Sequence, residues 1–272
     1  MLKTRVITAF ILLVLFLCAL FLLPMPGWVV LIMVLVMQGT LEWIHLAKLS
    51  GKTANVYWWL TLALLLAIVW CDWQHPEWTV LLHLFIYGMS ALMWLIVVPS
   101  WLIIGWQVRQ PLLMALTGWV LLIPTGLAMM DLRAFNPWLL LGMLGLVWVA
   151  DISAYFTGRK FGKTKLAPSI SPGKTWEGVF GALIGVTAYV LILVLFSGAS
   201  VLRNMLPLII ASWWWVGLAV IGDLFESAIK RQAGVKDSGT LLPGHGGLLD
   251  RIDGLTSTLP LTAMVLLFQS LA

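Results

Sequence analysis

Long apolar runs separated by short polar segments fill this chain. Each run approaches the roughly 20 residues that a helix needs to cross a bilayer, and none alternates as a membrane β-strand does. Because backbone groups in lipid must hydrogen-bond within their own segment, such runs predict helices. The predicted spans are 6–23, 28–46, 57–71, 79–97, 111–130, 137–157, 177–197, 205–225 and 253–271.

The composition agrees with this pattern. Of the 272 residues, 61% are apolar and only 10% are charged, whereas a soluble domain is about one quarter charged. We therefore expect an all-α, polytopic integral membrane protein with about nine transmembrane helices. The first run follows Lys3 and Arg5 as in a signal peptide, but its length and the lack of a small-residue cleavage pattern favour a retained span.

The distribution of basic residues predicts the orientation. If the N-terminus is cytoplasmic, fourteen of the sixteen Lys and Arg residues lie on the inner side, and only Arg133 and Arg203 lie outside. This asymmetry is what the positive-inside rule describes, and it explains the net charge of +5 without a nucleic-acid partner. Cys18 and Cys71 lie in apolar runs without CxxC spacing, so neither a disulfide framework nor a zinc site is indicated.

Residues that can carry chemistry are unevenly distributed. We expect residues 1–150 to form a lipid-facing scaffold of N-terminal membrane helices. We expect residues 151–272 to form a C-terminal membrane region that carries the chemistry, with its motifs in cytoplasmic loops. In the first part, Glu42, His45 and His83 are most simply interpreted as satisfied interior or interfacial polar residues.

The second half opens with a polar segment that suits an anion. A basic cluster is followed by Ser171-Pro-Gly-Lys174-Thr175, which predicts a turn leading into a helix N-terminus. Free N–H groups and the helix dipole favour phosphate at such a position. A role as topology anchor explains Arg159 and Lys160 well, but it explains Lys174 less well because Pro172 and Gly173 set this lysine apart.

Glycines in this region have two interpretations. The two Gly-Lys-Thr triplets lack the Gly-x4-Gly-Lys-Ser/Thr spacing of a P-loop, and neither follows a predicted strand. Gly178, Gly181 and Gly185 recur at three- and four-residue intervals on the next span. This spacing is typical of helices that pack closely.

The stretch 222–254 contains five of the chain's eleven acidic residues. Ionisable residues at the edge of membrane spans are costly and indicate a functional site. On a helix, Asp223, Ser227 and Lys230 would share one face, with Glu226 beside them. This face would bring carboxylates, a hydroxyl and an ammonium group to the point where the eighth span leaves the membrane.

Asp250 and Asp253 would share a face at the start of the last span. Two oxygen-bearing helix ends joined by a Gly-rich loop suit a hard cation, and Mg²⁺ is usually held by carboxylates together with substrate phosphates. The alternative is that the acids form interfacial salt bridges with Lys230, Arg231 and Arg251. That explains any single acid, but not five of them around a Gly-rich loop.

The residues of this stretch resemble the signature of the bacterial phosphatidate cytidylyltransferases, also called CDP-diacylglycerol synthases. A second block of that family is similar to Ala150-Asp151-x-x-Ala154-Tyr155 and to residues 171–178, whereas the first half is similar only in character. The signature reads Ser227-x2-Lys230-Arg231-x4-Lys236-Asp237-x4-Leu242-Pro243-Gly244-His245-Gly246-Gly247-x2-Asp250-Arg251-x-Asp253.

The resemblance implies an enzyme that converts CTP and phosphatidate to CDP-diacylglycerol and pyrophosphate. It further implies Mg²⁺, with a second, monovalent cation such as K⁺ as an additional expectation, and an active site on the cytoplasmic face of the bacterial inner membrane. It also implies a homodimer, to which residues 1–150 can contribute contacts, and a catalytic role for residues 151–272. Asp223, Asp250 and Asp253 would be metal-binding carboxylates and, with Lys230, catalytic residues. The substrate-binding residues would be Ser171, Lys174, Thr175, Ser227, Arg231, Lys236, His245 and Arg251.

Two other functions stay open from the sequence. A CTP-dependent kinase of a lipid alcohol would use a similar CTP and metal site, but it needs a base for the hydroxyl and releases CDP. An anion transporter should place ionisable residues near the bilayer midplane, whereas here they crowd on one side. No internal repeat of the kind common in transporters is evident.

Overall fold

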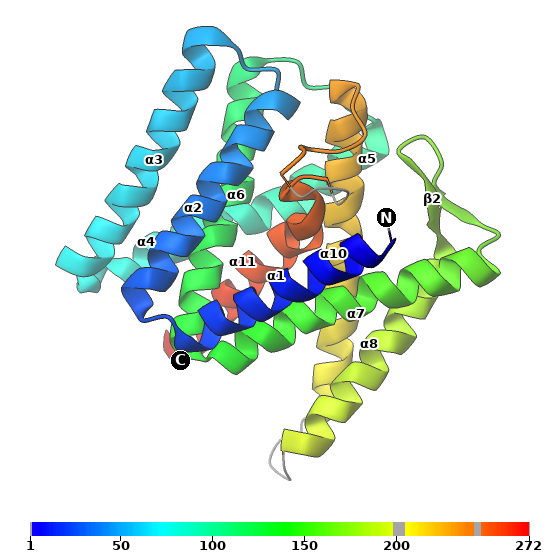
Figure 1. The fold of residues 1–272 in the computed structure, drawn as a ribbon. Coiled ribbons are helices and arrows are strands. Elements are labelled where there is room, and N and C mark those ends of the chain that lie inside the picture. Colours follow the sequence, from blue (N-terminus) through cyan, green and yellow to red (C-terminus); the bar gives the residue numbers. More distant parts are fainter. Residues whose placement is uncertain (1, 198–204, 242–245, 272) are drawn as a thin grey trace.

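The structure is a computed structural model that describes residues 2–197, 205–241 and 246–271, and it consists almost wholly of helices (Figure 1). In chain order the elements are α1 (Leu2–Leu22), α2 (Met25–Leu46), α3 (Gly51–Gln74), α4 (Pro76–Leu92), η1 (Met93–Val97), α5 (Val98–Ile104), α6 (Pro111–Phe135), α7 (Pro137–Phe161), β1 (Lys165–Ala167), β2 (Ser171–Thr175), α8 (Trp176–Ser197), α10 (Met205–Ala233) and α11 (Leu249–Leu271).

Every predicted span coincides with a helix, which confirms the all-α polytopic fold for the described part of the chain. Eight helices there are long and apolar enough to cross a membrane, and the apolar part of α1, Phe10–Leu22, is shorter. Several helices run beyond the predicted span. The longest extension is in α10, which continues through its polar end to Ala233.

The fourth span contains one irregular turn. A π-helical turn, η1, joins α4 to α5, and Pro99 follows in the first turn of α5. Proline has no N–H to donate to the carbonyl four residues earlier, and a π-bulge is a common local solution within a helix. Trp94 and Trp101, on either side of this junction, contact the ring of Phe225 edge to face at centroid distances of 5.8 and 5.3 Å.

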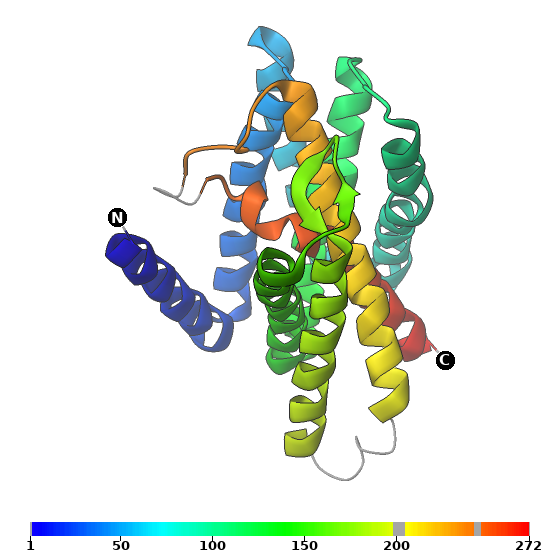
Figure 2. The ribbon, with the colours of Figure 1, turned by 90° about the vertical axis from the view of Figure 1, so that its right-hand side faces the viewer.

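The connections gather at two opposite ends of the bundle. In Figure 1 the α2–α3 and α5–α6 connections and the β1–β2 hairpin lie towards the upper end, and the α1–α2, α3–α4 and α6–α7 connections lie at the lower end. Helix α11 lies inside the bundle and packs against α4, α6 and α10. Figure 2 shows the N-terminal part of α1 apart from the rest of the bundle, whereas its C-terminal end is joined to α6 by the Arg133 side chain, which donates to the Leu20 carbonyl at 2.8 Å.

Helices α7 and α8 pack closely through small residues, as predicted. A Cβ atom at Gly181 would overlap the side chain of Thr157, and one at Gly185 would overlap that of Ser153. At Gly178 a Cβ would come within 3.0 Å of the Ala154 carbonyl oxygen. The absence of side chains at these glycines therefore sets the distance between the two helices.

The segment Ser171–Thr175 is a strand, so the prediction of a turn here is wrong. β2 pairs with β1 in an antiparallel hairpin, with Lys165 opposite Thr175 and Ala167 opposite Ser171. The turn lies at residues 168–170 instead, where the Ile170 amide donates to the Ala167 carbonyl at 3.1 Å. Pro172 is tolerated because both strands of a two-stranded hairpin are edge strands.

A buried polar cluster links α3, α4 and α6 near their lower ends. The two ring nitrogens of His83 lie 2.8 Å from Asp131 Oδ2 and 3.0 Å from Asp72 Oδ1. The Tyr87 hydroxyl donates to the same Asp131 oxygen at 2.7 Å. His83 is therefore a satisfied interior residue, as predicted, and its partners come from both neighbouring helices.

Candidate active site

A cavity of about 650 Å³ lies between α7, α8, α10 and the β1–β2 hairpin. It is the place where the two polar segments of the sequence meet. Three predicted substrate-binding residues, Ser171, Lys174 and Thr175, reach it from β2, and Asp223 reaches it from α10. Its small lining residues come from the packed faces of α7 and α8, so the close helix contact ends in an open polar space.

Lys174 and Asp223 form an ion pair inside this cavity. Both side chains are partly exposed, at 23% and 31%, so water and solutes can reach the pair. Ser227 lies one turn further along α10, with its hydroxyl 3.4 Å from Asp223 Oδ1. A triphosphate entering the cavity would compete with Asp223 for the Lys174 ammonium group, because phosphate oxygens are strong acceptors for cationic donors.

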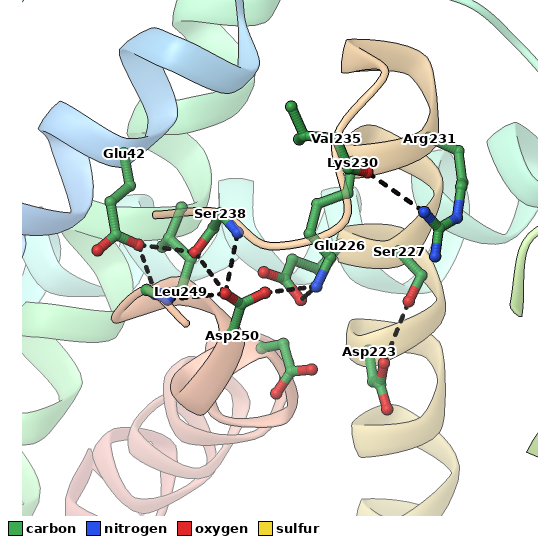
Figure 3. A network of polar contacts seen from close by, with 12 residues as sticks. Glu42, Asp223, Glu226, Ser227, Lys230, Arg231, Val235, Ser238, Leu249 and Asp250 are labelled. Atoms are coloured by element: carbon green, nitrogen blue, oxygen red, sulfur yellow. Dashed lines mark hydrogen bonds and ion pairs between the residues drawn. The ribbon is translucent and has the colours of Figure 1, made fainter. Parts of the chain in front are cut away.

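A second set of charges links α10 to α11 (Figure 3). The Lys230 ammonium donates to Glu226 Oε2 at 2.8 Å and to Asp250 Oδ1 at 2.5 Å, and the Lys230 side chain is only 11% exposed. The salt-bridge alternative therefore holds for Glu226 and Asp250. Both pairs are buried, and removing one partner of a buried pair leaves an uncompensated charge.

Asp250 also holds the segment that precedes α11. Its Oδ2 atom accepts from the Ser238 amide at 2.9 Å, the Ser238 hydroxyl at 3.0 Å and the Gly247 amide at 2.8 Å. Both carboxylate oxygens of Asp250 are therefore engaged by protein donors. A cation that bound Asp250 Oδ1 would have to compete with Lys230.

The carboxylates around this site suit a hard cation. Asp253 lies in the first turns of α11, and its charge is close enough to interact with those of Asp151, Asp223 and Glu226. Glu226 Oε1 is buried and has no hydrogen-bond partner among the described residues. Grouped carboxylates with an uncommitted oxygen are the donor type that Mg²⁺ takes together with phosphates. Within residues 2–197, 205–241 and 246–271, no three acidic, His or Cys side chains form a preformed metal cluster.

Thr175 has a structural role as well as a place in the cavity wall. Its side chain is nearly buried, and its hydroxyl accepts from the Gly178 amide at 3.2 Å. This is the N-cap contact that satisfies a free donor in the first turn of a helix. Thr175 thus fixes the start of α8 directly after the strand that carries Lys174.

Other predicted substrate-binding residues lie outside the cavity wall. Arg231 is exposed and donates to the Val235 carbonyl at 3.3 Å, at the end of α10. Lys236 and Arg251 are also exposed, and neither lines the cavity. His245 lies outside the described residues, so its predicted role stays a prediction.

Three acidic residues of the site received no role from the sequence. Asp151 lines the cavity, where its charge interacts with those of Asp223 and Lys174. Asp151 is the first residue of the polar segment 151–178, and this position was the feature of the sequence that could have identified it. Glu226 was visible beside the predicted face of α10. Glu42 gave no signal beyond being a carboxylate in an apolar span, because the partners that connect it to the site lie about 200 positions away.

Comparison with known proteins settles the family. A sequence model of the cytidylyltransferase family matches residues 3–269, nearly the whole chain. The chain belongs to this family. The cavity with its paired lysine and aspartate, and the buried carboxylates beside it, lie within the matched residues.

Two relatives match nearly the full length of this chain, and a third matches less than half of it. The phosphatidate cytidylyltransferase of Haemophilus influenzae is 37% identical over 282 aligned residues, which cover 96% of both chains. That of Pseudomonas aeruginosa is 39% identical, over 98% of this chain and 97% of its own. The enzyme of that name from Thermotoga maritima is 44% identical over 131 residues, 45% of this chain and 47% of its own.

Proposed function

We propose that this protein transfers the cytidylyl group of CTP to phosphatidate, giving CDP-diacylglycerol and pyrophosphate. The observation that carries the proposal is full-length similarity to two enzymes named for this reaction. The site supports it, since a cavity that contains Lys174 and Asp223 opens beside a buried carboxylate network. The multiple apolar helices make the protein integral to a membrane, which is where a lipid substrate resides.

The reaction needs no general base. A phosphate oxygen of phosphatidate is already ionised near neutral pH, and it forms a bond to the α-phosphorus of CTP. The bond from that phosphorus to the oxygen shared with the β-phosphate breaks, and pyrophosphate leaves with the electron pair. The difficulty lies in holding anionic reactants together and stabilising charge on the leaving group, so positioning and electrostatics dominate.

Several side chains of this chain suit those tasks. Lys174 lies in the cavity, where it can bind a phosphate of either substrate. Lys230 is paired with two carboxylates, so its ammonium group is oriented beside the site and offsets their negative charge there. Ser171 lines the same wall of the cavity as Lys174. Arg231, Lys236 and Arg251 lie on the exposed side of the site and stay proposed contacts for the triphosphate or the lipid phosphate.

We propose Asp223 and Asp253 as the metal ligands, and we propose that the third predicted ligand, Asp250, orients Lys230 and the segment before α11 instead. Mg²⁺ held there with substrate phosphates would stabilise charge on the transferring phosphoryl groups. The uncommitted oxygen of Glu226 supports a cation near this cluster, and a second, monovalent cation such as K⁺ belongs to the same proposal. Asp223 and Asp253 are better placed than Asp250, whose oxygens are both engaged by protein donors.

We also propose a location and an assembly. The excess of basic residues at one end supports an N-terminus in the cytoplasm, and with that orientation the cavity would face the compartment that contains CTP. The full-length relatives are bacterial, which supports the cytoplasmic membrane of a bacterium. A homodimer follows from the family resemblance, and chemical crosslinking of the protein in native membranes would test it.

The reaction is tested with CTP carrying a radioactive phosphorus at either the α or the γ position. Purified protein in detergent with Mg²⁺ and phosphatidate should move the α label, and not the γ label, into the organic phase. A lipid-alcohol kinase would move the γ label to an alcohol acceptor. Folded protein that leaves both labels in water with every lipid would reject both enzymes and reopen transport.

A matched pair of variants links the reaction to the cavity. Lys174→Ala should lower kcat/KM for CTP by roughly 100-fold or more, the usual loss when an electrostatic stabiliser is removed. Lys52→Ala removes an exposed lysine at the start of α3 and should leave the rate unchanged. Equal rates for the two variants would contradict the placement of the site.

A further inference from the structure

Glu42 is an acidic residue of α2 that accepts from the Gln38 side-chain amide of its own helix at 3.3 Å, whereas its other partners lie at the far end of the chain. Only 3% of this residue is exposed. Its Oε1 accepts from the Leu248 amide at 2.7 Å. Its Oε2 accepts from the Leu249 amide at 2.9 Å and the Ser238 hydroxyl at 2.8 Å (Figure 3). A scaffold helix thus reaches directly into the segment that connects α10 to α11.

The two amides mark the start of α11, which begins at Leu249. The first N–H groups of a helix have no partner within it, and a negative charge there is stabilised by the helix dipole. Glu42 supplies the missing acceptors and the negative charge, because each of its carboxylate oxygens accepts a hydrogen bond from one of these amides. An amide side chain in its place would keep only one acceptor oxygen.

The connecting segment has no spare volume where Glu42 enters it. A Cβ atom at Gly247 would overlap both the Glu42 carboxylate and the Ser238 hydroxyl. One at Gly239 would come within 3.0 to 3.1 Å of the Glu42 side chain. The backbone on both sides of the connection is therefore built closely around this carboxylate.

The contact continues into the carboxylate network. The Ser238 hydroxyl lies 2.8 Å from Glu42 Oε2 and 3.0 Å from Asp250 Oδ2. Asp250 in turn holds Lys230. Glu42 is therefore one residue removed from Asp250 and two from Lys230, although it does not line the cavity.

We propose that Glu42 is a positioning residue for the reaction. It fixes the segment around Ser238 and the start of α11, and through them it holds Asp250 and Lys230 in their working arrangement. This inference rests on the site proposed above. It assigns a role in catalysis to a helix of the N-terminal half, which carries none of the signature residues.

The test compares Glu42→Gln with Thr40→Val. Thr40 lies in the same helix, is also buried, and its hydroxyl donates to the Val36 carbonyl without reaching the connection to α11. Loss of a residue that orients a site commonly lowers activity by roughly 10- to 100-fold, and we expect a fall of that size in kcat for Glu42→Gln. Thr40→Val should keep the wild-type kcat.

Hydrogen exchange gives a readout that does not depend on activity. In Glu42→Gln the amides of the connection and of the first turn of α11 should exchange faster, while the other spans and the melting temperature stay as in the wild type. Faster exchange in all spans, or wild-type kcat in folded Glu42→Gln protein, would overturn the proposal. An inactive wild type would instead count against the proposed reaction.

Ser238→Ala tests the same contact from the other side and is available if Glu42→Gln does not fold. It should lower kcat in the same direction. The double variant should be no worse than the poorer single variant, because residues that share one interaction are not additive. Unchanged kcat in Ser238→Ala, or losses that multiply in the double variant, would mean that Glu42 does not act through this contact.

Discussion

At the scale of single residues, Asp223 and Asp250 have different surroundings although both were predicted to bind metal. Asp223 lies in the cavity and pairs with the partly exposed Lys174. Asp250 accepts from Lys230 and from three donors of the connecting segment. A carboxylate that already has a full set of donors is expected to orient its neighbours, and one with open positions is expected to bind the cation.

This difference predicts different kinetics for two equivalent substitutions. Asp223→Asn should raise the Mg²⁺ concentration for half-maximal rate by roughly tenfold or more, as expected for a lost ligand. Asp250→Asn should lower kcat at saturating Mg²⁺ with little change in that concentration, because it releases Lys230. Rates measured across a Mg²⁺ titration separate the two effects. An equal rise in both variants would show that Asp250 is a ligand too.

At the scale of elements, the contact between α7 and α8 depends on glycine. Gly181→Ala should destabilise the protein by about 1–3 kcal/mol, because an added methyl group has no room in a packed interface. The melting temperature in detergent measures this loss. Gly217→Ala on α10 is the control, since a Cβ there meets no atom within 4 Å. It should be neutral or slightly stabilising, because alanine favours helix.

The cluster around His83 joins α3, α4 and α6 at the end of the bundle opposite the β1–β2 hairpin. Asp131→Asn should weaken the contacts of Asp131 with both His83 and Tyr87, at a cost of about 1–3 kcal/mol for impaired buried hydrogen bonds. We expect a lower melting temperature with unchanged kcat below it. A large loss of kcat in protein that melts normally would instead give this cluster a part in the reaction.

At the scale of the whole molecule, the sequence predicts the helices well because each span is apolar along its full length. It fails at the strands β1 and β2, because both are short and β2 contains Pro172 and Gly173, two residues that suggest a turn. It also identifies Lys174 and Asp223, which the fold brings into one cavity. Glu42 could not be assigned, because the partners that link it to α11 lie 196 to 207 positions away and no local pattern reports such a contact.

The orientation of the whole molecule is tested by cysteine labelling. Single cysteines are introduced at Lys52 and at Glu77 after Cys18 and Cys71 are replaced by serine. The positive-inside rule predicts that an impermeant thiol reagent labels Glu77→Cys in intact spheroplasts and Lys52→Cys only after lysis. Lys52 lies at the start of α3 and Glu77 at the start of α4, and both native side chains are exposed. The reverse pattern would place the cavity away from cytoplasmic CTP.

The contact between Glu42 and the start of α11 has a consequence for how the protein is made. Synthesis proceeds from the N-terminus, so α2 leaves the ribosome long before the partners that its carboxylate will bind. A chain still being translated can already have most of its helices in the membrane, but the start of α11 has not yet been added. We therefore expect the nascent chain to stay inactive until translation has nearly ended, so that incomplete chains do not consume CTP.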